Sequence, residues 1–132
     1  RLTEFEASRN ADIIVGIEAR GVLLAAPLAH VAHRPLVPVR KKGKLPFETH
    51  SVAYSLEYGA DAVEVHTDAI ANGQRVLIVD DLLATGGTMA AAASLVERAG
   101  GVVVGLAVLV ELTELNGRAQ LEGYDVLSLI RY

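Results

Sequence analysis

The sequence predicts an α/β domain in which a mostly parallel central sheet is flanked by helices. Short apolar runs rich in valine and isoleucine alternate with longer stretches of helical character, without an internal repeat. Strands that alternate with helices form parallel sheets through right-handed crossovers. Residues 76–79 are short and β-branched, which is typical of a strand covered on both faces. We expect a single domain over residues 1–132.

Turn and cap residues divide the chain into elements. Strands of the main sheet are expected at residues 12–17, 36–40, 76–79, 102–110 and 126–130. Helices are expected at residues 21–33, 88–99 and 116–121. Pro35 closes the first helix, Gly100 and Gly101 stop the second, and Asn72 with Gly73 marks a turn. A polar loop at residues 41–51 leads into an antiparallel pair, expected as a hairpin beside the sheet at residues 53–56 and 62–65.

The composition limits the class of protein. Hydrophobic residues make up 52% of the 132 residues, yet no apolar run approaches the ~18 residues of a membrane span. The chain has no cysteine, which excludes disulfides and thiolate metal sites and is compatible with the cytoplasm. No signal-peptide pattern opens the chain. The net charge of −4 argues against broad nucleic-acid binding. We expect a cytoplasmic protein without a nucleic-acid or membrane partner.

The most informative segment is residues 75–88, in which an apolar strand ends in two acids. Asp80 and Asp81 come at the carboxyl end of the strand, where open α/β sheets bind ligands. Glycines let the backbone approach an anion, and the N–H groups at a helix N-terminus favour negative charge. The segment suits a sugar phosphate, with acids for the ribose hydroxyls and a loop for the phosphate. The loop residues are Ala84, Thr85, Gly86, Gly87 and Thr88.

This segment resembles the phosphoribosyl-pyrophosphate (PRPP) signature of the type I phosphoribosyltransferases. A Walker loop would need Gly-Lys-Ser/Thr at another spacing, and the dinucleotide pattern Gly-x-Gly-x-x-Gly is absent here. The alternative is a strand–turn–helix unit with incidental acids, but two adjacent acids would repel each other without a polar ligand or a cation. The resemblance implies the type I phosphoribosyltransferase fold, including a flexible β-hairpin loop.

A second junction between a strand and a helix contains Glu18, Ala19, Arg20 and Gly21. Its backbone N–H groups can surround an anion, and the Arg20 guanidinium can add a two-pronged contact. The resemblance assigns these residues to the pyrophosphate loop, which often carries a non-proline cis peptide, and makes Arg20 catalytic. The alternative is an ordinary helix start with Arg20 in solvent.

Four cations lie within five residues of this acidic chain: Arg40, Lys41, Lys42 and Lys44. A run of charge is usually a solvated face, and nuclear targeting is a weaker alternative. Pyrophosphate is polyanionic, however, and a mobile basic loop can close on it. The segment is similar to that of the adenine branch of the family. The resemblance implies that Arg40, Lys41 and Lys44 bind substrate and that Arg40 reaches into the neighbouring subunit's site, which makes the enzyme a homodimer.

Residues 54–59 nearly match the signature of the adenine branch. By resemblance, Glu57 is the catalytic acid near N7 of the purine, Tyr58 packs over the closed site, and Leu112 lies under the adenine ring. A carboxylic acid near N7 can guide the tautomer and protonation of a base that attacks through N9. The alternatives are a surface hairpin and, for Leu112, an ordinary core leucine.

The start of the chain departs from the family pattern. Only about eleven residues precede Asp12, whereas the family has a longer N-terminal segment, part of which forms a hood over the base. Since the chain also opens at Arg1 rather than at methionine, we expect the hood segment to be missing. Arg118 and Arg131 match no motif and are expected to be surface charges.

The resemblance implies transfer of the phosphoribosyl group of PRPP to adenine, which gives AMP and pyrophosphate in purine salvage. Mg²⁺ is the implied cofactor, held through pyrophosphate and ribose hydroxyls, and no direct protein ligands to a metal are expected. Two alternatives stay open. One is a PRPP-binding regulatory domain, although retention of Glu57 and Tyr58 argues against it. The other is a phosphoribosyltransferase for another purine base.

Overall fold

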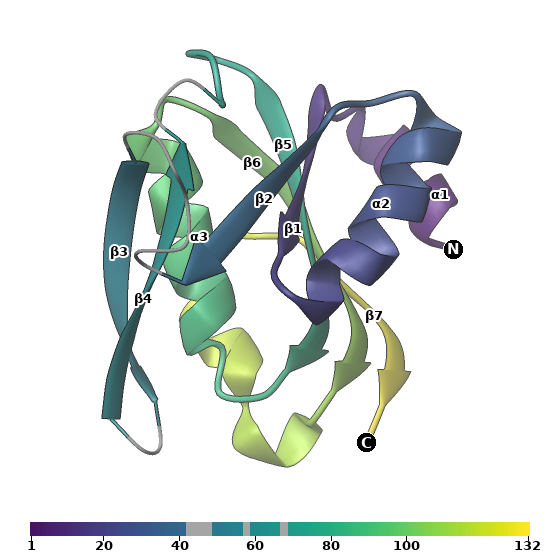
Figure 1. The fold of residues 1–132 in the computed structure, drawn as a ribbon. Coiled ribbons are helices and arrows are strands. Elements are labelled where there is room, and N and C mark those ends of the chain that lie inside the picture. The colour runs from purple at the N-terminus through teal and green to yellow at the C-terminus, as the bar shows by residue number, and fades with distance from the viewer. Residues whose placement is uncertain (42–48, 57–58, 67–68) are drawn as a thin grey trace.

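The computed structural model describes the backbone of residues 1–41, 49–56, 59–66 and 69–132, and the side chains of residues 1–40 and 69–132. Within these residues the strands form one seven-stranded sheet in the order β3-β4-β2-β1-β5-β6-β7 (Figure 1). The strands are β1 (Ile13–Ile17), β2 (Leu36–Lys41), β3 (Thr49–Leu56), β4 (Gly59–His66), β5 (Arg75–Leu83), β6 (Val102–Glu111) and β7 (Val126–Arg131).

The sheet is mostly parallel, as predicted. The five strands β2, β1, β5, β6 and β7 run parallel to one another, and the β3–β4 hairpin adds to β2 through an antiparallel contact of β4. Val15 of β1 lies beside Val37 on one side and Ile78 on the other, so β1 and β5 occupy the middle of the sheet. The hairpin strands are longer than the sequence predicted, because their pairing continues beyond the apolar residues.

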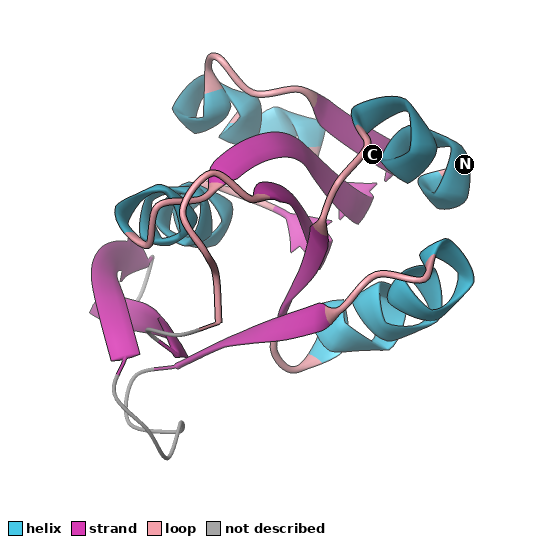
Figure 2. Cartoon of the chain, turned by 90° about the horizontal axis from the view of Figure 1, so that it is seen from above, coloured by secondary structure: helices cyan, strands magenta, loops and turns pink. Residues whose placement is uncertain are grey.

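Helices cover both faces of the sheet (Figures 1 and 2). The helices α1 (Leu2–Arg9) and α2 (Arg20–Ala32) lie on one face, and α3 (Gly87–Arg98) lies on the other. Two short 3₁₀ helices, η1 (Thr113–Leu115) and η2 (Gly117–Leu121), connect β6 to β7. Within the described residues no helix has both the length and the apolar character needed to cross a membrane.

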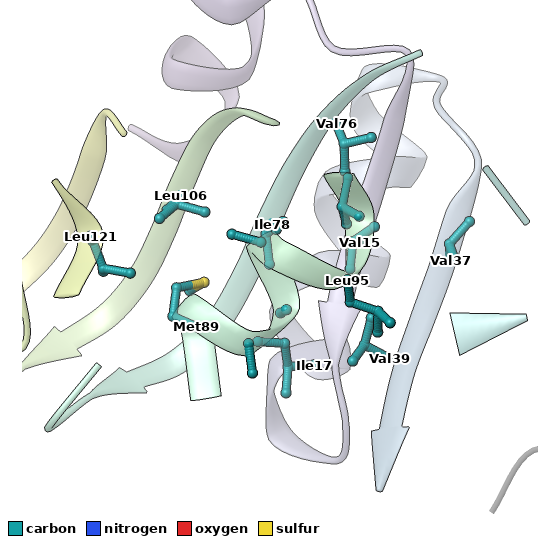
Figure 3. Close-up of a cluster of buried hydrophobic side chains, with 14 of the residues drawn as sticks. Val15, Ile17, Val37, Val39, Val76, Ile78, Met89, Leu95, Leu106 and Leu121 are labelled. Carbon is teal, nitrogen blue, oxygen red and sulfur yellow. The ribbon is translucent and has the colours of Figure 1, made fainter. Parts of the chain in front are cut away.

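Alternate residues of the central strands form two hydrophobic cores, one on each face. Ile14 is fully buried with Ala25 and Leu28 under α2. Val15 is fully buried in the larger cluster with Leu95 of α3 (Figure 3). Since side chains of a strand point alternately to opposite faces, the nearly continuous apolar runs are what a doubly covered sheet requires.

Three elements differ from the sequence prediction. β5 continues to Leu83, so that Asp80 and Asp81 lie inside the strand; Asp80 is paired with Val108 of β6, and this ladder overrides the low strand propensity of aspartate. Residues 116–121 lie mostly in the 3₁₀ helix η2, with Asn116 in a left-handed conformation as its N-cap. α1 was not predicted, because the residue that it buries is the polar Glu6, which forms an ion pair with Arg34.

Candidate functional site

The loops that follow β1 and β5 meet at the carboxyl edge of the sheet (Figure 1). A cavity of about 200 Å³ lies there. Its walls come from β5, from the β5–α3 loop (residues 84–88, including the first turn of α3) and from the start of α2. The lining residues are Arg20, Asp80, Asp81, Leu82, Leu83, Ala84, Thr85, Gly86, Gly87, Thr88 and Met89. The structure therefore brings both predicted acids, the whole predicted loop and Arg20 into one site.

The β5–α3 loop places the N-terminus of α3 at this cavity. Gly86 is the N-cap of α3 and has φ 90, a conformation that glycine adopts without steric cost. Within the described residues, α3 has no side-chain cap and no acid in its first turn. The first N–H groups of a helix lack partners within the helix and carry its positive dipole end. This end of the cavity is suited to an anion, as the sequence predicted.

The two acids have different surroundings. Asp80 is 8% exposed, and its Oδ1 accepts a hydrogen bond of 2.8 Å from the backbone N–H of Asp81. Burial first, and the neighbouring Asp81 side chain second, raise the pKa of the Asp80 carboxyl to about 8, against the opposing effects of the Asp81 N–H and of Arg20. Asp81 is more exposed and forms an ion pair of 3.0 Å with Arg20 Nε. The site thus holds one carboxylate in an ion pair with Arg20 and one buried carboxyl that retains its proton up to about neutral pH.

The β1–α2 loop (residues 18–21) is built from charged side chains. The peptide bond between Glu18 and Ala19 is cis, as the resemblance predicted. Glu18 Oε2 forms an ion pair of 2.5 Å with Arg40 Nε, and neither side chain lines the cavity. Gly21 does not line it either; a Cβ on Gly21 would come within 2.9 Å of Asp80 Oδ1, so this glycine allows α2 to pack directly on β5.

Several predicted site residues lie elsewhere or outside the described residues. Leu112 lines a separate depression with Glu114, Leu115 and Tyr132. It is partly buried, so its predicted place under the base stays a prediction. Lys41 ends β2, and only its backbone is described. Lys44, Glu57 and Tyr58 lie outside the described residues.

The structure adds residues that the sequence did not single out. Leu82, Leu83 and Met89 complete the cavity wall. Gly117 and Gln120 of η2 contact the β5–α3 loop from behind: a Cβ on Gly117 would lie 2.5 Å from the Ala84 carbonyl oxygen, and Gln120 Nε2 donates to the Thr85 carbonyl oxygen at 2.7 Å. No local pattern signals these contacts, because they join segments about thirty residues apart.

Arg118 and Arg131, which were expected to be surface charges, are partly exposed, and both also form ion pairs with Glu111, which is 3% exposed, at 3.0 Å and 3.3 Å. Ser128 Oγ also donates to Glu111 Oε1, at 2.5 Å. Burial by itself would raise the pKa of Glu111, but the hydrogen bonds from Ser128 and Arg118 and the charges of the two arginines together lower it. The sequence signal for this buried partner was the position of Glu111, an acid that directly follows the apolar run of β6.

The donor set of the cavity fits magnesium that arrives with a phosphorylated substrate. Within the described residues, no group of three or more histidine, aspartate and glutamate side chains could hold a metal ion. The cavity offers two carboxylates, those of Asp80 and Asp81. Mg²⁺ is commonly bound through one or two carboxylates together with substrate phosphates, and it keeps several waters.

Comparison with known proteins gives the family. The model of the phosphoribosyl transferase domain matches residues 2–128. An adenine phosphoribosyltransferase of Clostridium perfringens is 57% identical over 132 residues, which is 100% of this chain and 77% of the relative. The chain belongs to the adenine phosphoribosyltransferase family.

Solved structures of adenine phosphoribosyltransferases have the same fold. The enzyme of Thermoanaerobacter pseudethanolicus is 53% identical, with a TM-score of 0.92 over 99% of this chain and 78% of that one. The Saccharomyces cerevisiae enzyme, solved with adenine and D-2,5-dideoxy-2,5-imino-altritol 1,6-bisphosphate, is 41% identical, with a TM-score of 0.91 over 96% of this chain and 73% of that one. The family match spans both strand-end loops and the hairpin. The type I phosphoribosyltransferase fold expected from the PRPP signature is therefore confirmed.

Proposed function

We propose that this chain transfers the phosphoribosyl group of PRPP to adenine and forms AMP and pyrophosphate, a reaction of purine salvage. The observation that carries the proposal is the cavity in which a backbone-built anion loop lies beside two carboxylates and an arginine. The high identity to adenine phosphoribosyltransferases and the adenine bound to the yeast relative support the choice of base.

Each part of the cavity has a role in this proposal. The β5–α3 loop, residues Ala84, Thr85, Gly86, Gly87 and Thr88, binds the 5′-phosphate through backbone N–H groups and threonine hydroxyls. Asp80 and Asp81 accept hydrogen bonds from the ribose hydroxyls, directly or through water. Arg20 donates to the pyrophosphate, and the neighbouring Glu18, Ala19 and Gly21 shape the loop that holds it.

The chemistry is a substitution at the anomeric carbon. The bond from C1 to the pyrophosphate oxygen breaks while the bond from C1 to adenine N9 forms, and C1 is oxocarbenium-like between them. The proton on the imidazole ring of adenine is released to water or to the departing pyrophosphate. The protein contributes by holding the sugar and the base in line and by stabilising the negative charge that develops on pyrophosphate. Glu57 lies near N7 in this proposal, Tyr58 covers the base, and Leu112 packs under it.

Magnesium is the proposed cofactor. Pyrophosphate, ribose hydroxyls and water would supply its ligands, and Asp80 and Asp81 are the described residues that would face it through the ribose hydroxyls and water. When bound, Mg²⁺ neutralises charge on the pyrophosphate leaving group.

A homodimer is also part of the proposal. Arg40, Lys41 and Lys44 are cations of one segment, and Arg40 is paired with Glu18 of its own chain in the described structure. Reaching a neighbouring site would require Arg40 to exchange this carboxylate for pyrophosphate, which is the more highly charged partner. The cytoplasm is the proposed compartment, because PRPP is a polyanion that does not cross membranes unaided.

The decisive experiment measures AMP formation from PRPP and adenine, together with Glu57→Leu. If Glu57 donates a proton or a hydrogen bond near N7, the substitution lowers kcat/KM for adenine by about 10²–10⁴-fold, the usual scale for a general acid. PRPP affinity changes little, because the β5–α3 loop, Arg20 and the acids are intact. Glu57→Gln retains an amide donor and is the matched, milder variant.

Two results would contradict the proposal at different levels. A wild-type chain that binds PRPP but forms no AMP favours the regulatory alternative. A Glu57→Leu variant that turns over adenine at the wild-type rate would leave the activity standing and show that residues 54–59 serve only as a lid.

A further inference from the structure

η2 lies directly behind the β5–α3 loop, and its contacts are made to the loop's backbone. A Cβ on Gly117 would lie 2.5 Å from the Ala84 carbonyl oxygen and 3.1 Å from the Gly86 nitrogen, so the two backbones touch without an intervening side chain. Conversely, a Cβ on Gly86 would collide with the Gly117 carbonyl oxygen. The loop therefore cannot move toward η2 without displacing it.

Gln120 fixes the orientation of one peptide plane in that loop. Its Nε2 donates to the Thr85 carbonyl oxygen at 2.7 Å. In a planar trans peptide the C=O and the following N–H point in opposite directions. The Gly86 N–H therefore points away from the Gln120 amide. Thr85 and Gly86 line the cavity and no residue of η2 does, so the hydrogen bond from η2 sets the orientation of a peptide in the cavity wall.

Arg118 in turn holds η2 against the sheet. Its Nε donates to both carboxylate oxygens of Glu111 at 3.0 Å, and its Nη1 and Nη2 reach the Val126 carbonyl oxygen at 3.3 Å and Ser128 Oγ at 3.2 Å. Glu111 is 3% exposed, so removal of Arg118 would leave a buried carboxylate without one of its two positive partners, which destabilises the fold. One side chain thus joins η2 to both β6 and β7.

We propose that Gln120 and Arg118 are positioning residues that hold the β5–α3 loop in the shape that binds the 5′-phosphate. Gln120 orients the Thr85–Gly86 peptide directly, and Arg118 acts through the placement of Gly117. The inference rests on the proposed function, because it takes the 5′-phosphate as the ligand of this loop. Neither side chain lines the cavity, so both act from outside it.

The kinetic consequence is specific. The 5′-phosphate does not change during the reaction, so contacts to it stabilise the ground state and the transition state equally. Loss of such contacts raises KM and leaves kcat nearly unchanged. A defect of folding alone would lower the active fraction, and with it the apparent kcat, and would leave the KM for PRPP at its wild-type value.

The test measures kcat, the KM for PRPP and the unfolding temperature in three variants and a control. We expect Gln120→Ala to raise the KM for PRPP by about threefold to tenfold, the effect of one hydrogen bond, without a change in kcat. Arg118→Gln raises it by roughly tenfold or more, and Arg118→Lys, which keeps the charge but not the fork, recovers part of the loss.

The matched control is Tyr124→Phe. Tyr124 follows η2 and its hydroxyl donates to Glu97 near the far end of α3, so its loss costs stability without touching the loop. If Gln120→Ala and Arg118→Gln leave the KM for PRPP at the value of the Tyr124→Phe variant, the inference is wrong while the proposed function stands. A wild-type chain that binds no PRPP would instead overturn the proposed function, and this inference with it. If Arg118→Gln does not fold, the exposed Gln120→Ala still decides the question.

Discussion

The β5–α3 loop and the β1–α2 loop lie at the same edge of the sheet but are built in different ways. The first uses backbone: a glycine at φ 90, an uncapped helix N-terminus and the close approach of Gly117. The second uses charged side chains in ion pairs, Arg20 with Asp81 and Glu18 with Arg40. A backbone site is rigid and is lost when a side chain is added, whereas a side-chain site can exchange partners when a ligand arrives. The two loops therefore suit the two ends of PRPP, a phosphate that stays and a pyrophosphate that leaves.

The largest expected effect comes from adding a side chain to the backbone site. Gly86→Val abolishes PRPP binding, because its Cβ collides with the Gly117 carbonyl oxygen and displaces the loop. Gly123→Val is the matched control: Gly123 also has φ +90, but nothing lies within 4 Å of its Cβ position. Both variants carry the same backbone strain. Calorimetry with PRPP separates them, and unchanged affinity in a folded Gly86→Val protein would show that the loop does not bind the phosphate.

The next effect concerns the acids between the two loops. Replacement of both Asp80 and Asp81 by asparagine weakens PRPP binding by roughly a hundredfold, because the charge of Asp81 is lost and residue 80 can no longer ionise when the ribose hydroxyls bind. Binding of free adenine changes far less. Titration of each ligand into the double variant measures both, and equal losses for PRPP and adenine would count against a ribose contact.

A smaller effect is expected at the side-chain site. Arg20 is 75% exposed, and an exposed ion pair contributes little stability, so Arg20→Gln folds as well as the wild type. It weakens pyrophosphate binding by roughly tenfold, the cost of a charge-assisted contact, and leaves ribose 5-phosphate binding unchanged. Parallel titrations with these two ligands test whether the β1–α2 loop binds pyrophosphate and the β5–α3 loop binds the 5′-phosphate. If Arg20→Gln weakens the binding of both ligands, this assignment of the two loops is wrong.

The smallest expected effect is a dependence of binding on pH. Burial raises the pKa of Asp80 from 3.8 to about 8, so the folded chain keeps a proton that the unfolded chain has lost, and stability from this group falls as pH rises through that window. Binding to ribose hydroxyls favours the ionised form, so ribose 5-phosphate affinity rises a few-fold between about pH 7 and pH 9. The phosphate itself, with a second pKa of about 6, is fully ionised there. Asp80→Asn should show a flat profile, and a flat wild-type profile would contradict the assignment.

Much of the site could be predicted from sequence because its chemistry is local. The run from Asp80 to Thr88 is continuous in the chain, and a strand followed by a glycine loop and a helix places all of it at one edge. Arg20 was found by the same argument applied to a second strand. Gly117, Gln120 and Arg118 could not be found in this way, since they belong to η2, which follows β6. Gly117 and Gln120 contact the loop only in the folded chain, and Arg118 acts on it through the position of Gly117.

By itself, the sequence determined the alternation of strands and helices, the two strand-end loops and the family. These features depend on periodicity, on glycine and on short motifs, all of which act over a few neighbouring residues. Only the tertiary structure decided that Asp80 and Asp81 lie inside β5 and that Asp80 is buried with a raised pKa. It also decided that Glu111 is the buried partner of Arg118 and Arg131. The reason is physical: burial and pairing depend on which distant segments pack together, and that is settled by the sheet as a whole rather than by any window of the chain.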